Sequence, residues 1–467
     1  MPRRVPAAIA ALVVLVACGH SSKPKATATT SPAATTTAST APTTSGTAGP
    51  VGTWLMAQRD PTRSGVDEQS PAVDLSHATR RWQSAKIDGD VYGQPLVVGS
   101  QVIVATTNDT VYSFDAATGK QQWASHVGTP VRARDLPCGN VDPVGITGTP
   151  AVGGQQLVYA VAFVAPGRHE LVALHLADGK EAFRKPVDGP GADPRTHNQR
   201  GGLLVANGRV YVPFGGRLGD CGTYHGTIVS VAVDGQGASQ SYVVPSQNRA
   251  GMWSPGGLVA DGSGNVFGVT GNSSSSGAFD DANAVIRLTG ALKESDVWAP
   301  TNWKALNAND IDVGTETPAL VPASGGLPAR MLVPSKAGIA YLLDPAKLGG
   351  VGGELANKRI CGSSFGGTAH AGRRAYVSCR DGVYAVDAGD RDITVVWHGP
   401  RFNSGPPIVA GGLIWALDVD GGVLYGLDAA SGSARVSTRV GSVTHFATPG
   451  ADGAVFVAAG GTVQAFL

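Results

Sequence analysis

Charge, cysteine and long apolar runs are all scarce in this chain of 467 residues. Only 15% of the residues are charged and the net charge is +1, which gives no electrostatic reason to expect nucleic acid or a strongly acidic partner. An apolar run near the start, Ala7 to Val16, is too short to span a bilayer. No CxxC or HxxxH spacing supports a metal site. No Ser-His-Asp or Cys-His set stands at a motif-defined spacing.

Glycine and proline are abundant instead, at 65 and 30 residues, and they suit many tight turns rather than helices. The most informative segment runs from Val111 to Trp123 and reads VYSFDAATGKQQW. Degenerate copies follow: LVALHLADGKEAF from Leu171, VYAVDAGDRDITVVW from Val383 and LYGLDAASGSARV from Leu424, with weaker echoes from Ala340 and Thr462. Repetition at about 40–50 residues is typical of propeller blades with four strands each.

The repeat can be interpreted as a β-hairpin. Val111, Ser113 and Asp115 alternate with two aromatic residues, which is the period-2 pattern of a strand with unlike faces. Asp115 can accept backbone N–H bonds in a turn, and Gly119 can supply the positive φ that reverses the chain. Trp123 is large enough to fill the wedge between neighbouring sheets.

The opening strand of each unit carries small residues or proline before an apolar pair. Eight such starts are found, at Gly93, Gly148, Gly201, Pro255, Thr315, Phe365, Gly405 and His445. The last unit has only three strands before the chain ends, and Arg80 to Ala85 can supply the fourth. Closing the ring with strands from both termini would leave no free sheet edge. We therefore predict an all-β, eight-bladed propeller of four-stranded antiparallel blades, with seven blades as the alternative because units four and five diverge most.

The repeat motif resembles the PQQ-type repeat of quinoprotein dehydrogenases and of BamB-like lipoproteins. The resemblance covers most of the chain from about Trp54. The resemblance is specific for the fold and weak for activity. For a quinoprotein dehydrogenase it implies PQQ on the propeller axis, packed between a tryptophan and a disulfide of adjacent cysteines, and a Ca²⁺ ion. No two cysteines are adjacent here. The run Asp280-Asp281-Ala282-Asn283 could be drawn as a Ca²⁺ loop, but acidic turn residues more often cap hairpins.

The N-terminal region predicts export and lipidation. Residues 1–17 form a short signal peptide that ends at a lipobox, LVACG, which implies lipidation (palmitate) of Cys18. Residues 18–52 are a Thr/Pro/Ala-rich tether that cannot bury enough apolar area to fold, and residues 53–467 form the propeller. We expect a membrane-anchored lipoprotein facing outward from the cytoplasm. An excess of Arg over Lys and the long tether favour an actinobacterial envelope.

Four cysteines remain in the mature domain: Cys138, Cys221, Cys361 and Cys379. An even count in an exported protein predicts two disulfides. Three pairings are open, and we favour Cys361–Cys379, whose members are close in sequence, together with Cys138–Cys221. A metal site is the rival interpretation.

Four long connections between blades are the main sequence evidence for a binding function. They run over residues 132–146, 187–200, 245–254 and 299–315, and all should emerge on one face around the channel mouth. Candidate ligand-binding residues on this face are Asp142, Arg200, Trp253 and Asp312. We predict a monomeric, non-catalytic scaffold without a cofactor that binds an envelope protein or a small ligand here. The alternatives are a PQQ/Ca-dependent dehydrogenase and a small-ligand or glycan-binding propeller; loops that merely seal the channel would be the simplest outcome.

Overall fold

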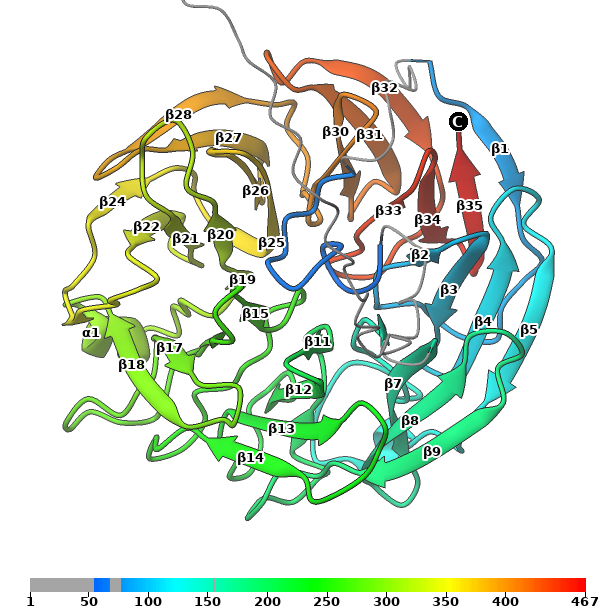
Figure 1. The fold of residues 1–467 in the computed structure, drawn as a ribbon, viewed down its shortest axis with the longest axis horizontal. Coiled ribbons are helices and arrows are strands. Elements are labelled where there is room, and N and C mark those ends of the chain that lie inside the picture. Colours follow the sequence, from blue (N-terminus) through cyan, green and yellow to red (C-terminus); the bar gives the residue numbers. More distant parts are fainter. Residues whose placement is uncertain (1–53, 68–76, 154–155) are drawn as a thin grey trace, which may run out of the picture. The chain divides into compact units, whose positions relative to one another are not determined.

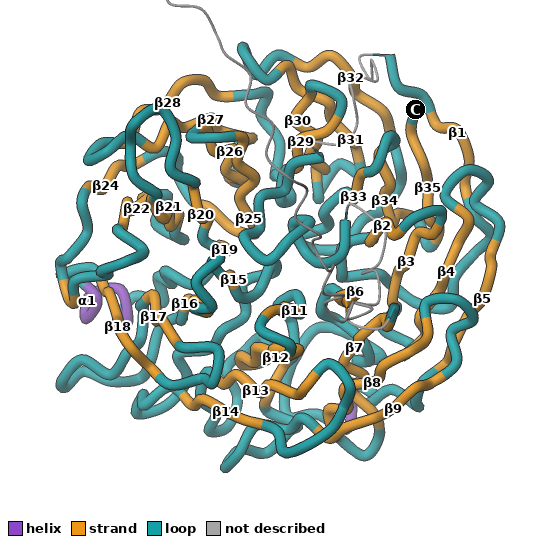
Figure 2. Tube along the Cα trace, viewed as in Figure 1, coloured by secondary structure: helices purple, strands orange, loops and turns teal. Residues whose placement is uncertain are grey.

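The computed structural model describes residues 54–67, 77–153 and 156–467, all within one compact unit, Thr47–Leu467. The signal peptide, Cys18 and the tether lie outside the described residues. Eight antiparallel sheets follow one another around a ring, with the first strand of each sheet toward the central channel (Figure 1). The prediction of an eight-bladed, all-β propeller is confirmed, and the regular structure of the described residues is almost entirely strand, joined by loops (Figure 2).

The blades are numbered 1 to 8 along the chain, and their strands are given from the channel outward. Blades 1 to 4 comprise β2 (Leu96–Val98), β3 (Gln101–Ala105), β4 (Thr110–Asp115) and β5 (Gln121–His126); β6 (Ala151–Gly153), β7 (Leu157–Val164), β8 (Arg168–His175) and β9 (Glu181–Pro186); β11 (Leu204–Ala206), β12 (Arg209–Gly216), β13 (Thr227–Ala232) and β14 (Gln240–Val243); and β15 (Val259–Ala260), β16 (Val266–Val269), β17 (Val285–Leu288) and β18 (Glu294–Ala299). A short strand, β10 (His197–Asn198), also pairs with β12.

Blades 5 to 8 comprise β20 (Ala319–Val321), β21 (Arg330–Pro334), β22 (Ile339–Leu343) and β24 (Ala356–Arg359); β25 (Ser364–Ala371), β26 (Arg374–Cys379), β27 (Gly382–Ala388) and β28 (Ile393–His398); β29 (Ile408–Ala410), β30 (Leu413–Asp418), β31 (Val423–Asp428) and β32 (Ala434–Arg439); and β33 (Gly450–Ala451), β34 (Val455–Ala459), β35 (Thr462–Phe466) and β1 (Arg80–Gln83). As predicted, the N-terminal strand β1 pairs with the C-terminal strand β35, with Arg80 opposite Phe466. The ring is closed by both ends of the domain.

The repeated glycine and tryptophan hold neighbouring blades together. Asp115 accepts hydrogen bonds from the backbone and hydroxyl of Thr118, and Gly119 turns the chain at φ 71°. A Cβ on Gly119 would lie 2.4 Å from the Trp82 ring of the preceding blade. The Trp82 indole N–H in turn donates to Ala116 O at 2.9 Å. Glycine is therefore required for both its backbone conformation and its lack of a side chain.

The same contact between a tryptophan and a glycine turn of the next blade recurs around the ring. Trp123 donates to Leu176 O and Trp397 donates to Ala429 O, each at 3.0 Å. A Cβ on Gly179 or on Gly432 would approach these rings to 2.5 and 2.4 Å. The sequence repeat therefore encodes contacts between blades as well as hairpins within them.

Four elements depart from the sequence interpretation. The segment that starts at Thr315 is split: β19 (Glu316–Thr317) pairs in parallel with β25 of blade 6, whereas β20 begins blade 5. A further strand, β23 (Gly350–Val351), pairs in parallel with the outer strand β18. The loop of residues 299–315 contains a short helix, α1 (Trp303–Ala308), and residues 132–146 contain a 3-10 turn, Ala133–Asp135. Among the described residues, no helix is long and apolar enough to cross a membrane.

The segment Trp54–Asp67, here called the plug, runs through the centre of the ring (Figure 1). Trp54 pairs with Val97 of blade 1, Leu55 accepts from Val152 of blade 2, and Asp67 donates to Val409 of blade 7. Between these points the plug bonds to blades 3, 4 and 6 through Leu203, Ala260 and His370. The inner strands of six blades are thus bridged by the chain's own N-terminal residues.

Candidate functional site: the channel and its loop-covered face

A buried arginine fastens the plug to the inner side of blades 3 and 4. Arg63 has 0% exposure. Its guanidinium donates to three carbonyls, Leu258 O at 2.8 Å, Ala57 O at 2.6 Å and Leu203 O at 3.1 Å. Burial lowers the pKa of Arg63 to about 9, against a smaller raising effect of Asp60. The side chain therefore ties the plug to blades 3 and 4 and occupies these three carbonyls.

A second buried arginine, Arg200, lies at the mouth of the channel on the loop-covered face. Arg200 donates to Thr147 O at 3.2 Å and His445 O at 3.0 Å, and it stacks on the rings of Tyr92 and Phe446 at 5.4 and 5.5 Å. These partners precede the inner strands of blades 1, 2 and 8. The sequence interpretation offered Arg200 as a ligand contact. In the structure its guanidinium instead fastens connections from opposite ends of the chain to one another.

Aromatic rings gather around Arg200 at the mouth. Phe446 lies 6.4 Å from Trp253 and 6.3 Å from Phe365 between ring centroids. Phe446 has φ 63°, a conformation that a bulky side chain rarely adopts and that is often associated with functional sites. The guanidinium of Arg380 lies 5.0 Å above the Phe365 ring and is exposed, unlike that of Arg200. Arg380 is therefore an exposed cation at this mouth that can meet a partner.

The remaining predicted residues differ in their positions. Asp312 is 5% exposed and accepts the Asn272 N–H at 2.8 Å, with Lys336 at 3.6 Å. It lies beside Trp253, because a Cβ on Gly271 would touch both side chains. Burial raises the pKa of Asp312. The contacts of Asp142 are local to its own loop: the Ala133 N–H and Arg132. The structure thus brings Arg200, Trp253 and Asp312 into one region and leaves Asp142 within its loop.

An open groove of about 410 Å³ lies between blades 8 and 1. Its lining comes from the connection before β2, the connection before β33 and the turn between β34 and β35, with Asn140 from the long loop of blade 1. The side chains that reach it include Asp90, Tyr92, Asn140, Ser442 and His445. By contrast, the cavity on the axis beside the plug measures about 10 Å³, room for about one water molecule. This groove was not predicted from the sequence, because most of its lining lies outside the four longest connections.

A pair of buried histidines lies beneath the loops of blades 2 and 3. The His169 ring bonds to Asp188 at 3.0 Å and packs between Phe163 and Phe214 at 4.3 and 5.0 Å. Burial lowers the pKa of His169, and it lowers that of His197 to about 4. Both rings are therefore neutral core residues at neutral pH.

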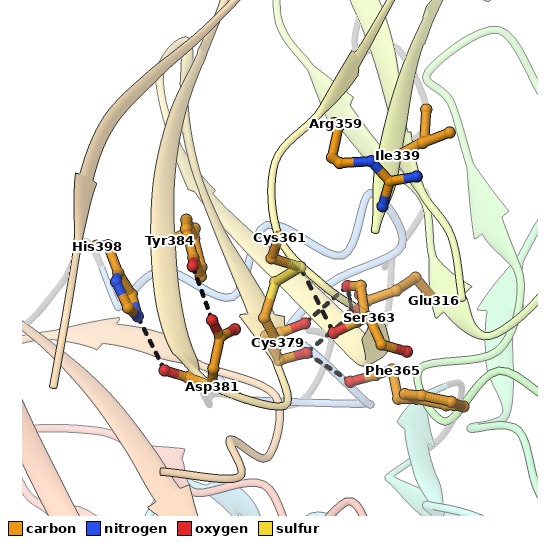
Figure 3. Close-up of a disulfide and its surroundings, with 12 residues drawn as sticks. Glu316, Ile339, Arg359, Cys361, Ser363, Phe365, Cys379, Asp381, Tyr384 and His398 are labelled. Atoms are coloured by element: carbon orange, nitrogen blue, oxygen red, sulfur yellow. Dashed lines mark hydrogen bonds between the residues drawn. A yellow bond between two sulfur atoms is a disulfide. The ribbon is translucent and has the colours of Figure 1, made fainter. Parts of the chain in front are cut away.

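The cysteines are joined as Cys138–Cys221 and Cys361–Cys379, the pairing that the sequence favoured. The sulfurs of Cys361 and Cys379 lie within 4.8 Å of an Asp381 carboxylate oxygen, the spacing of possible metal ligands. Because the two sulfurs are bonded to one another, they are not available as thiolate ligands. Figure 3 shows that Asp381 instead accepts from the Tyr384 hydroxyl, at 3.0 Å, while its backbone carbonyl accepts from His398.

Glu316 on β19, close to this disulfide (Figure 3), is a fully buried acid. It accepts from the hydroxyls of Ser364 and Ser378 at 2.6 and 2.9 Å and from Thr368 at 3.3 Å. Burial raises its pKa to about 8, although these hydroxyls act in the opposite direction. Glu316 thus joins β19 to blade 6 through three hydroxyl hydrogen bonds.

The Asp280–Asn283 run serves as an internal support. Asn283 donates to Asn307 Oδ1 at 2.9 Å and accepts the Val313 N–H at 2.7 Å. Asp280 accepts from Gln247 N and the Ser273 hydroxyl. Asn283 thus holds the long loop of residues 299–315 and Asp280 is bonded elsewhere, so these two side chains are already engaged within the protein.

Comparisons with known proteins support the fold. Residues 34–158 match the family model described as outer membrane protein assembly factor BamB. No curated protein sequence matches the chain. The structure is similar to quinohemoprotein alcohol dehydrogenase from Comamonas testosteroni, with a TM-score of 0.68, 15% identity and coverage of 88% of this chain and 80% of the other. A europium-containing methanol dehydrogenase has a TM-score of 0.64, 15% identity and coverage of 87% and 89%.

BamB from Moraxella catarrhalis is also similar, with a TM-score of 0.56, 15% identity and coverage of 83% of this chain and 97% of the other. At these identities the likeness shows a shared propeller fold. It leaves open whether the chain acts as an enzyme or as a binding protein.

The axis of the described structure does not fit a PQQ cofactor. The plug crosses the centre of the ring (Figure 1), and the cavity beside it, of about 10 Å³, is far smaller than the roughly 300 Å³ of the smallest typical ligand pockets. Neither disulfide joins adjacent cysteines. We therefore derive no reaction step through a quinone.

Proposed function

We propose that this chain is a non-catalytic envelope lipoprotein whose propeller binds an envelope protein partner on its loop-covered face. The observation that carries the proposal is the plug, because the chain's own backbone lies where a cofactor would have to bind. Binding capacity then remains at the mouth and its rim, where aromatic rings and Arg380 lie together. Aromatic and arginine side chains are the types that contribute most to protein interfaces.

The same proposal includes the position of the protein in the cell. Lipidation at Cys18 would attach the chain to the outer side of the cytoplasmic membrane or to another envelope membrane, and residues 18–52 would act as a tether. The lipobox supports this attachment. A monomer without nucleic-acid partners is consistent with the net charge of +1 and with the closed ring of strands.

The experiment compares two faces of the same blade. Arg380 lies in the turn between β26 and β27 at the mouth, whereas Arg391 lies in the turn between β27 and β28 at the opposite end of the sheet; both side chains are exposed. We expect Arg380→Ala combined with Trp253→Ala to reduce recovery of crosslinked partners from cells, and Arg391→Ala to leave recovery unchanged. Thermal unfolding checks that the variants are folded. Full recovery by a folded Arg380→Ala, Trp253→Ala variant would show that the mouth is not the binding surface.

A second candidate function is binding of a small ligand. The groove of about 410 Å³ favours it, because its volume falls within the range of about 300–1,000 Å³ typical of small-molecule pockets. The two functions are compatible, since both use the same face.

A further inference from the structure

The groove between blades 8 and 1 contains polar side chains without protein hydrogen-bond partners. Within the described part of the chain, the Asp90 carboxylate, the Asn140 amide, the Tyr92 hydroxyl and the His445 ring form no hydrogen bonds with other side chains or backbone groups. They come from three connections that are far apart in sequence. Three exposed groups and one half-buried tyrosine therefore converge on one open space without being used to hold the fold.

The groove itself is held by other bonds. The Thr444 hydroxyl donates to Val91 O at 2.7 Å, which joins the connection before β33 to the connection before β2. Lys86 donates to Gly460 O on the third side. Arg200 fixes Tyr92 from behind through its ring and its carbonyl. The free side chains thus project from connections that are already fixed, which lowers the entropy cost of binding.

The chemistry of the lining narrows the class of ligand. Asp90 is the one acidic side chain among the lining residues, which is too few for a divalent cation. Asp90 would repel an anion by its charge. The two nearby cations, Lys86 and Arg200, are already bonded to backbone carbonyls. A purely apolar ligand would leave the carboxylate, amide and hydroxyl unpaired. A ligand with several neutral hydroxyl groups satisfies all of them.

We propose that this groove binds a neutral saccharide, with Asp90 and Asn140 pairing with sugar hydroxyls and Tyr92 forming an apolar and hydrogen-bonding wall. The proposal deepens the second candidate function above and rests on it. His445 separates the groove from the small pocket of about 50 Å³ that contains Phe365 and Arg380. A longer glycan could therefore extend from the groove across His445 to the mouth.

The test uses purified protein from residue 47 onward, the compact unit, and saturation-transfer NMR. The probes are glucose, mannose, galactose, arabinose, N-acetylglucosamine and maltose at millimolar concentration, with ethanolamine as a cationic probe. We expect at least one sugar to bind, and Asp90→Asn to weaken that sugar by about tenfold or more, as expected for loss of a charge-assisted hydrogen bond. Asn140→Ala provides a second variant whose side chain is exposed. Asp135→Asn, an exposed acid outside the groove in the same long loop as Asn140, is the matched control and should bind normally.

Three results would overturn the saccharide site. These are no binding of any sugar by folded protein, equal binding by wild type and both groove variants, or preference for ethanolamine. Each leaves partner recovery through Arg380 and Trp253 untouched, so a failure here is distinguishable from a failure of the scaffold proposal. Selective loss in Asp90→Asn and Asn140→Ala, with the control unaffected, supports the site.

Discussion

The axis of the propeller and the groove at its rim are lined by similar kinds of residue and use them in opposite ways. In the plug and at the cavity beside it, Arg63 and Gln94 are bonded to backbone carbonyls, and the remaining space is about 10 Å³. At the rim, Asp90 and Asn140 face an open groove of about 410 Å³. Polar residues near a channel therefore indicate a ligand site only where their hydrogen bonds are not already satisfied within the protein.

A propeller places its axis and its loop-covered face next to each other, and either can bind a ligand. Filling the axis with a segment of the chain gains contacts with six blades but removes the central cavity. What remains for recognition is the face where the connections between blades differ most in length and composition.

The largest effect is expected at the plug. Arg63→Met removes three donors from buried carbonyls and should lower the free energy of unfolding by about 3–5 kcal/mol, the range for disrupting a buried hydrogen-bond network. Arg132→Met, at an exposed position in a loop, should change it by less than about 0.5 kcal/mol. Urea unfolding of both variants measures the difference. Equal stabilities would mean that the plug does not hold the blades together.

A smaller difference is expected between the two disulfides. Cys138–Cys221 fastens the loop-covered face across 83 residues, whereas Cys361–Cys379 spans 18 residues beside Glu316. In the chain-entropy model the longer loop contributes about 1 kcal/mol more. Replacing each pair by serine and measuring unfolding under identical conditions compares them. A larger loss for the short bridge would show that native contacts of the buried sulfurs outweigh loop entropy.

The pH dependence of stability should reflect the buried acid near the axis. The pKa of Glu316 is about 8 in the folded chain, against an ordinary value of 4.5. Between these values the folded state retains a proton that the unfolded state releases, so the stabilising contribution is present below pH 4.5 and is lost as pH rises toward 8. Glu316→Gln should therefore make stability less dependent on pH over this interval, by no more than a few kcal/mol. Burial raises the pKa of Asp109 to about 8 as well, and that contribution should persist in the variant. Parallel pH profiles for wild type and Glu316→Gln would contradict the assignment.

Much of the fold could be predicted because the determinants repeat. The hairpin motif around Asp115, Gly119 and Trp123 marks a blade each time it occurs. Counting blades in this way gave a last unit of only three strands, which predicted that β1 supplies the fourth. The split at Thr315 could not be predicted, since Glu316 joins blade 6 only through contacts with residues about 50 positions away. Local pattern carries no information about such a pairing.

The plug was missed for the same physical reason. Its sequence has no strand periodicity. Gln58, Arg59 and Arg63 have positive φ, although Gln and Arg rarely adopt this conformation and so do not predict it. Several of its hydrogen bonds reach partners far away in sequence, up to 386 positions. The face with long loops was predictable from blade geometry alone. Which of its residues are free, such as Arg380, and which are bonded, such as Arg200, depends on the assembled ring.

The central claim is that the chain fills its own axis, and titration with PQQ and Ca²⁺ tests it most directly. Purified protein is mixed with the quinone and the ion, passed through a desalting column, and examined for the quinone absorption band and for dye-linked alcohol oxidation. The account predicts that no quinone is retained and that no alcohol is oxidised. Retention of one equivalent of quinone with alcohol oxidation by the intact chain would contradict it.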